Sequence, residues 1–102
     1  MTLQEKLVAE LKSSMLAKNA DRTGTLRMVK SALGYLQIEQ KVDSLSDAEV
    51  TSVLQREAKK RRDAIDEYGR AVRPELAAKE LAELKVIEEF LPKALGPEEL
   101  EA

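Results

Sequence analysis

Nucleophilic catalysis is the first chemistry to consider, and this sequence offers few groups for it. The chain contains no histidine and no cysteine, which excludes Ser-His and Cys-His catalytic pairs and zinc sites built on imidazole or thiolate ligands. Ser13 and Ser14 stand side by side, a pairing also found in amidases. They fall in the middle of a predicted helix, with no glycine-rich turn and no activating base. We interpret both as polar helix positions and expect no catalytic residue.

Phosphate and metal chemistry have equally little support in the sequence. The chain has no glycine-rich phosphate cradle of the P-loop or Rossmann type. Asp63, Asp66 and Glu67 supply the carboxylate oxygens that Mg²⁺ prefers. Because Lys60 and Arg62 are interleaved with them, ion pairs between neighbours are the better interpretation. We expect neither a cofactor nor a metal.

The charges are distributed unevenly along the chain, although the net charge is only −2. Residues 55–73 carry seven basic and four acidic side chains, whereas residues 74–102 carry three basic and eight acidic ones. This asymmetry predicts either contact between the two segments or a basic patch that binds a partner.

The most concentrated basic run is KKRRD, residues 59–63. When the segment is wound as a helix, its apolar residues form one stripe and most of its basic residues spread over the opposite, outer face. Basic residues on an exposed helix face could contact the phosphate groups of an RNA. The candidates for such contacts are Arg56, Lys59, Lys60 and Arg62. Acidic residues lie among them, and an ordinary solvated helix face is the alternative.

Arg61 differs from its neighbours because the same winding places it within the apolar stripe, together with Glu57. Glu80 and Glu83 fall within the apolar stripe of the following helix. The short connection at 69–73 predicts that the two helices are antiparallel neighbours. Our hypothesis is a partly buried polar cluster of these four residues that fixes the register of the hairpin. The alternative is that Arg61 extends past a narrow stripe into solvent.

The elements that must position these residues begin with two amphipathic helices in the first half of the chain. The first is predicted over residues 3–18, after a T-x-x-E capping box formed by Thr2 and Glu5. The second follows the tripeptide NAD, with Asp21 as its N-cap. Gly34 interrupts this helix, and we expect a tight crossing with a neighbour there.

The second half of the chain predicts two more helices. The third begins at a capping box of Ser46 and Glu49 and ends at Gly69, because glycine is the usual residue after a helix C-terminus. The fourth begins at Pro74, which suits a first helical turn, and ends before Pro92.

Membrane and secretory signals are missing from the sequence. The N-terminal segment carries charges of both signs instead of the apolar stretch of a signal peptide. No run approaches the roughly 20 apolar residues of a membrane span. We therefore expect a reducing, cytoplasmic location and no membrane contact.

Three stretches carry a family resemblance: TLRMVKSAL (25–33), SDAEVTSVLQREAKKRRDAIDEY (46–68) and ELAAKELAELKVIEEFLP (75–92). Together they resemble the GatB/YqeY domain family over essentially the whole chain. Its stand-alone, YqeY-like members are small bacterial proteins related to the tail of the B subunit of the glutamine-dependent aspartyl/glutamyl-tRNA amidotransferase. In that enzyme the tail helps to hold tRNA while other domains do the chemistry. The family label is carbon–nitrogen ligase activity with glutamine as amide donor.

These observations lead to one set of expectations. The fold class is all-α, an irregular array of four helices of which the last two form an antiparallel hairpin, with a truncated fifth helix at the C-terminus. Residues 1–95 form the YqeY-like helical domain, and residues 96–102 begin a second helical domain that is otherwise absent. The resemblance implies an accessory module that assists tRNA-linked amidation through contact with tRNA or a protein partner. The alternative is a helical protein-interaction or structural module with no RNA role.

Overall fold

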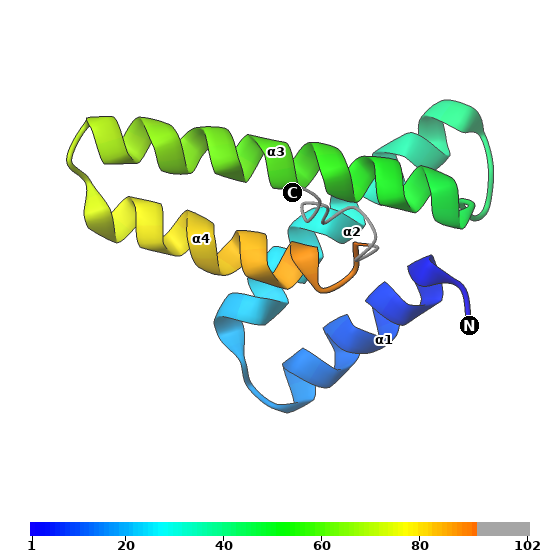
Figure 1. Cartoon of the computed structure of the whole chain (residues 1–102). Coiled ribbons are helices and arrows are strands. Elements are labelled where there is room, and N and C mark those ends of the chain that lie inside the picture. Colours follow the sequence, from blue (N-terminus) through cyan, green and yellow to red (C-terminus); the bar gives the residue numbers. More distant parts are fainter. Residues whose placement is uncertain (92–102) are drawn as a thin grey trace, which may run out of the picture.

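Four helices and no strands make up the part of the chain that the computed structural model describes, residues 1–91. They are α1 (Leu3–Leu16), α2 (Ala20–Gln40), α3 (Asp47–Arg70) and α4 (Pro74–Glu88). Helices α3 and α4 form an antiparallel hairpin, α2 crosses behind the hairpin, and α1 packs beside α2 (Figure 1). The prediction of an all-α fold with four helices is confirmed. The predicted fifth helix and second domain lie outside the described residues.

Both predicted capping boxes are confirmed. The Glu5 N–H donates to the Thr2 hydroxyl at 3.1 Å, and the Thr2 N–H donates to the Glu5 carboxylate at 2.8 Å. Ser46 and Glu49 form the same reciprocal pair at the start of α3. The backbone N–H groups of Thr2 and Ser46 hold the pKa values of their carboxylate partners below the ordinary glutamate value, because they stabilise the ionised form.

The N-terminus of α2 differs from the prediction. Asn19, not Asp21, is the N-cap, and its side-chain oxygen accepts a hydrogen bond from the Arg22 N–H at 3.2 Å. The cause is the turn after α1. Helix α1 ends at Leu16, and Lys18 adopts a left-handed conformation with φ 58°. The chain reverses there, so Asn19 is the residue in position to cap.

The predicted end of α3 at Gly69 is also wrong. The helix continues through this glycine to Arg70, since a helical glycine costs only about 1 kcal/mol relative to alanine. The chain reverses at Val72, whose φ is 56°. The Arg73 N–H then donates to the Tyr68 carbonyl at 2.8 Å, and the Val72 N–H donates to the Gly69 carbonyl at 3.2 Å. This is a Schellman motif with valine in the position that glycine usually takes.

The core lies where α2 crosses the hairpin and where α1 covers it. The largest fully buried side chains come from α2, α3 and α4: Leu26, Val29, Leu33, Val50, Leu54 and Ile87. The tight crossing predicted at Gly34 is wrong, because a Cβ atom at this position would have no neighbour within 4 Å. The row of α2 that faces the core runs through Leu33, and Gly34 is turned away from it.

Candidate functional site

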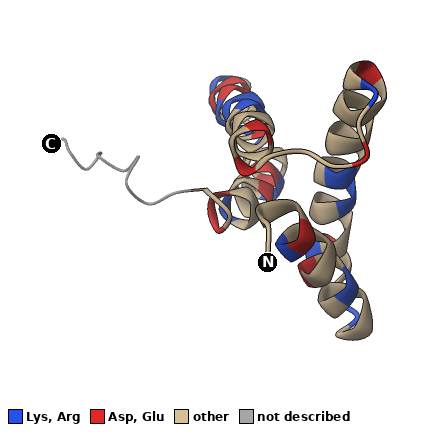
Figure 2. Cartoon of the chain, turned by 90° about the vertical axis from the view of Figure 1, so that its right-hand side faces the viewer, with Lys and Arg blue, Asp and Glu red and all other residues tan. Residues whose placement is uncertain are grey.

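The four basic residues predicted as RNA contacts are all exposed along α3. Figure 2 shows basic and acidic segments interleaved on the α3–α4 hairpin. Three of the cations are paired with carboxylates, at nitrogen–oxygen distances of 3.1 Å for Lys59–Asp63, 3.3 Å for Lys60–Glu57 and 3.9 Å for Arg62–Glu88. Arg56 forms no ion pair with any residue of the described chain. The outer face of α3 is therefore of mixed charge, and Arg56 is the one of the four predicted cations without an ion pair among residues 1–91.

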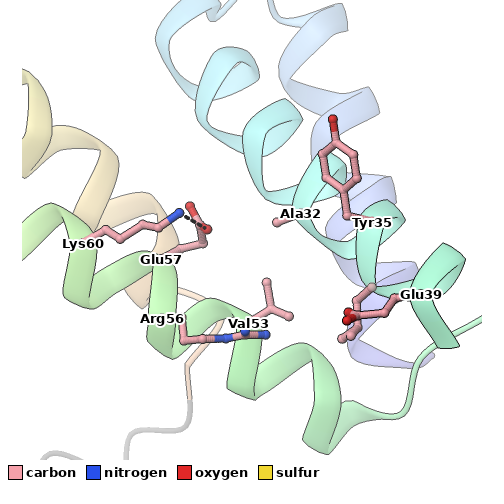
Figure 3. Close-up of a pocket in the computed structure, with 8 residues that line it drawn as sticks. Ala32, Tyr35, Glu39, Val53, Arg56, Glu57 and Lys60 are labelled. Carbon is pink, nitrogen blue, oxygen red and sulfur yellow. Dashed lines mark hydrogen bonds and ion pairs between the residues drawn. The ribbon is translucent and has the colours of Figure 1, made fainter.

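Arg56 and Lys60 also border a groove of about 270 Å³ between α2 and α3, here termed the α2–α3 groove. Glu57 lies beside them on α3, and Glu39 lines the opposite side from α2 (Figure 3). Two cations and two carboxylates thus surround this groove. Its charge is balanced, which weakens its attraction for a phosphate chain.

Tyr35 is a groove residue that the sequence interpretation did not assign to a site. It lines the α2–α3 groove, its side chain points away from α3 (Figure 3), and it is 75% exposed. The sequence did contain a signal for its exposure. Tyr35 lies between Leu33 and Leu36 in the sequence, but outside the apolar row of α2 to which these two leucines belong. An exposed aromatic ring at the edge of a groove that Arg56 and Lys60 also line offers a surface on which a base or a planar side chain can stack.

Arg61 points in the opposite direction from the other basic residues and is only 7% exposed. Its Nη1 atom donates to the Glu57 carboxylate at 2.7 Å and to the Glu57 carbonyl at 3.2 Å. Its Nε atom lies 3.3 Å from the Glu83 carboxylate. Its Nη2 atom contacts the Met28 sulfur at 3.7 Å. The guanidinium therefore joins α2, α3 and α4 and does not extend into solvent.

The fourth member of the predicted cluster is not paired with this arginine. Glu80 is half-buried but forms no ion pair with any residue in the described range. The contact between Arg61 and Glu83 is itself imperfect. The two atoms are close enough for an ion pair, but Nε has no hydrogen-bond acceptor in suitable geometry. The structure brings together Arg61, Glu57 and Glu83, and the role of this trio in setting the hairpin register stays a prediction.

The paired serines have different environments, and neither hydroxyl is hydrogen-bonded to a basic side chain among residues 1–91. Ser13 is exposed, whereas Ser14 is 4% exposed. The Ser14 hydroxyl donates to the Leu11 carbonyl at 2.8 Å and shares a 2.8 Å hydrogen bond with the Thr23 hydroxyl. These contacts tie α1 to α2 and satisfy buried polar groups. They give Ser14 a structural role.

Residues 1–91 contain neither a metal-binding cluster nor a membrane-spanning helix. Within this range, no group of three or more Asp or Glu side chains is arranged to hold a metal ion. The same residues include no helix with the length and apolar character needed to cross a bilayer.

Comparison with known proteins gives one family and three similar proteins. The family model described as "Yqey-like protein" matches residues 4–102. An uncharacterized protein of Schizosaccharomyces pombe is 32% identical over 91 residues, which cover 89% of this chain and 73% of that protein. Altered inheritance of mitochondria protein 41 of Kluyveromyces lactis, named as mitochondrial, is 33% identical over 82% of this chain and 45% of its own length.

The protein of the same name from Vanderwaltozyma polyspora is 31% identical over 83% of this chain and 46% of its own length. This chain therefore spans less than half the length of the two relatives that carry this name.

Proposed function

The chain belongs to the YqeY-like protein family, and on this basis we propose that it is an accessory module of tRNA-linked amidation. In this proposal it contacts tRNA through the outer face of α3 and supplies no catalytic group. The carbon–nitrogen ligase activity of the family label, with glutamine as amide donor, then belongs to the larger system that the module assists. The observation that carries the proposal is the row of exposed cations on α3, with Arg56 unpaired.

The ion pairs on α3 do not prevent such contact. Exposed pairs of this kind contribute only about 0–1 kcal/mol each. A phosphate group can therefore replace the carboxylate at Lys59 or Arg62 with little loss of stability. Each phosphate that a protein cation neutralises releases its counterions. Binding through about three or four phosphates should therefore weaken steeply as salt is added. We expect weak, backbone-directed binding without base readout.

The location of the protein forms part of the same proposal. A cytoplasmic site of action follows from the family's bacterial, stand-alone members. Two relatives that span more than twice the matched length are named as mitochondrial. A tRNA partner would be available in either compartment.

The test is a titration of the full chain with bulk tRNA at about 50 mM and about 200 mM salt. The Arg56→Gln/Lys59→Gln variant should bind several-fold more weakly and show a shallower salt dependence. Lys12→Gln/Lys30→Gln is the matched control, because both lysines are exposed on α1 and α2 and the net charge changes equally. If the control loses as much affinity as the α3 variant, α3 is not the contact surface.

A helical protein-interaction or structural module without an RNA role is the second candidate. The balanced charges around the α2–α3 groove favour it, as does a separate groove between α2 and α4 that is lined by both apolar and charged residues. Absence of tRNA binding at the lower salt concentration would contradict the tRNA proposal and favour this second candidate.

A further inference from the structure

A larger groove of about 770 Å³ lies between the N-terminal half of α2 and the length of α4, and is here termed the α2–α4 groove. Small or flexible apolar residues form its walls. They are Ala20, Gly24 and Met28 on α2, and Ala78, Ala82 and Val86 on α4. Within each helix these residues are four apart, so each set forms one ridge along the helix surface. Two such ridges with a gap between them have the geometry that accepts a third helix.

Gly24 gives this groove an unusual feature. Glycine within a helix costs about 1 kcal/mol relative to alanine, and no contact in the described structure offsets this. A Cβ atom added at Gly24 would have no neighbour within 4 Å. The missing side chain therefore leaves open space at this position of α2, and the packing of residues 1–91 does not require that space. Local departures from good helix-forming sequence of this kind are expected where another molecule approaches closely.

The buried Arg61 supports two of the residues that line the groove. Met28 and Glu83 both line the groove, and both contact Arg61, through Nη2 and Nε respectively. Among the described residues, Nε of Arg61 is the one buried side-chain polar atom without a hydrogen-bond partner. Arg61 therefore connects the two walls of the groove, and no residue of α3 lines it.

The charges at the rim of the groove define what can enter it. Most of them are already paired within the chain: Arg22 with Glu10 and Glu89, Glu75 with Arg73, and Glu83 with Arg61. Hydrogen bonding to Glu89 even raises the pKa of Arg22. Asp21 on α2 and Lys79 on α4 form no ion pair with any residue from 1 to 91. One wall thus presents an unengaged carboxylate and the other an unengaged ammonium group.

We propose that the α2–α4 groove docks an amphipathic helix from another protein. The small apolar stripe of that helix packs between Gly24 and Ala82. One of its flanks presents a basic side chain to Asp21, and the other presents an acidic side chain to Lys79. This proposal goes beyond tRNA contact, because it assigns a second partner to a second surface.

The proposal can be tested with three designed helical peptides that share one alanine-leucine stripe. Their flanks carry lysine and glutamate, glutamate on both sides, or lysine on both sides. Binding to the full chain is measured by fluorescence anisotropy, and the site is mapped by amide chemical shifts. The native chain should bind the mixed peptide about three- to fivefold more tightly than the other two, as expected for exposed charge pairs. Shift changes should fall on residues 19–28 and 75–86.

Charge variants then reverse the preference, whichever direction the peptide runs. Asp21→Lys makes both rims basic and should favour the glutamate-flanked peptide. Lys79→Glu makes both rims acidic and should favour the lysine-flanked peptide. If all three peptides bind all variants equally, or none binds up to about 1 mM, which corresponds to only about 4 kcal/mol, the proposal is overturned.

Filling the groove provides the steric arm of the test. Gly24→Leu should weaken every peptide at least tenfold, without lowering the stability of the chain, because leucine is a better helix former and the space is open. Ala48→Leu is the matched control, since Ala48 is exposed at the start of α3 and lies outside the groove.

Equal losses in Gly24→Leu and Ala48→Leu would contradict docking at this site. Sedimentation of the peptide-free chain adds a further outcome. If the chain dimerises and Gly24→Leu dissolves the dimer, the groove holds a second copy, and the proposed partner helix is wrong. Binding to tRNA should be unchanged in Gly24→Leu, so failure here can be told from failure of the tRNA proposal.

Discussion

Replacing Arg61 with methionine removes the charge that joins three helices while keeping an unbranched apolar side chain. In the native structure the guanidinium contacts Glu57 at 2.7 Å and Glu83 at 3.3 Å. The three side chains are only 8%, 12% and 15% exposed, in the order Arg61, Glu57 and Glu83. The variant therefore leaves two carboxylates in a largely dry interface without their shared cation.

The loss in the free energy of unfolding depends on how well the two carboxylates are still neutralised or hydrated in the variant. Removing one partner of a buried ion pair costs about 3–5 kcal/mol. Glu57 retains Lys60, whose Nζ lies 3.3 Å from its other oxygen. Glu83 has no second cation among the ion pairs of residues 1–91, but its partial exposure lets water reach it. We therefore expect the lower end of the range, about 3 kcal/mol, which reduces the folding equilibrium constant about 150-fold.

Urea unfolding at pH 7, followed by circular dichroism, measures this difference. Arg56→Met is the matched control on the same helix, and its exposed position predicts a change within about 0.5 kcal/mol. Glu57→Gln and Glu83→Gln, added to Arg61→Met, should restore at least half of the lost stability, because neutral amides need no counterion.

An Arg61→Met variant as stable as the native chain would refute the reasoning. It would mean that desolvation of the arginine offsets everything the ion pairs contribute, as happens for some buried pairs that are replaced by apolar residues. A loss that the two glutamine substitutions do not relieve would also contradict it, because the deficit would then come from packing and not from uncompensated charge.

Two further predictions concern polar contacts of the helix termini and the α1–α2 interface. Ser14→Ala should lower the free energy of unfolding by about 1–2 kcal/mol, because it leaves the buried Thr23 hydroxyl unpaired. Ser14→Ala/Thr23→Val should recover most of this loss in the same urea assay, and an additive double variant would contradict the pairing. The pKa of Glu49 is lowered below its ordinary 4.5 by the Ser46 backbone, so its stabilisation is present above pH 4.5 and is lost as pH falls through the lower folded value. The stability advantage of the native chain over Glu49→Gln should therefore shrink between pH 6 and pH 3, and a constant difference would contradict it.

The four helices and the N-termini of α1, α3 and α4 could be predicted from the sequence, because their signals are local, whereas the N-cap of α2 depends on the turn at Lys18. A serine or threonine followed three residues later by glutamate defines a capping box whatever the tertiary structure, and Pro74 starts α4 for an equally local reason. The C-termini of α1, α2 and α3 could not be predicted in this way. The three connections between helices turn at Lys18, Lys41 and Val72, all with φ near +57°. Glycine is the expected residue at such positions, and the chain uses none there.

The candidate functional residues show the same difference between local signals and features that depend on tertiary packing. The helical periodicity of the third helix distinguished Arg61 from its exposed neighbours, because burial on a regular helix follows this periodicity. The absence of an ion pair to Glu80 depends on the rotation of α4 against α3, which no periodicity sets. Tyr35 and the α2–α4 groove depend on where α2 crosses the hairpin. That crossing is set by packing between residues far apart in the chain, so the grooves could only be seen in the structure.

The buried arginine connects the two surfaces for which partners are proposed. Glu57 lines the α2–α3 groove, whereas Glu83 and Met28 line the α2–α4 groove, and all three contact Arg61. Loss of this side chain should therefore disturb both grooves together with the stability of the hairpin. Reduced binding in an Arg61 variant would then not identify a contact surface. Assignment of a partner to either groove requires substitutions such as Arg56→Gln and Gly24→Leu, which each alter one groove and leave the Arg61 contacts intact.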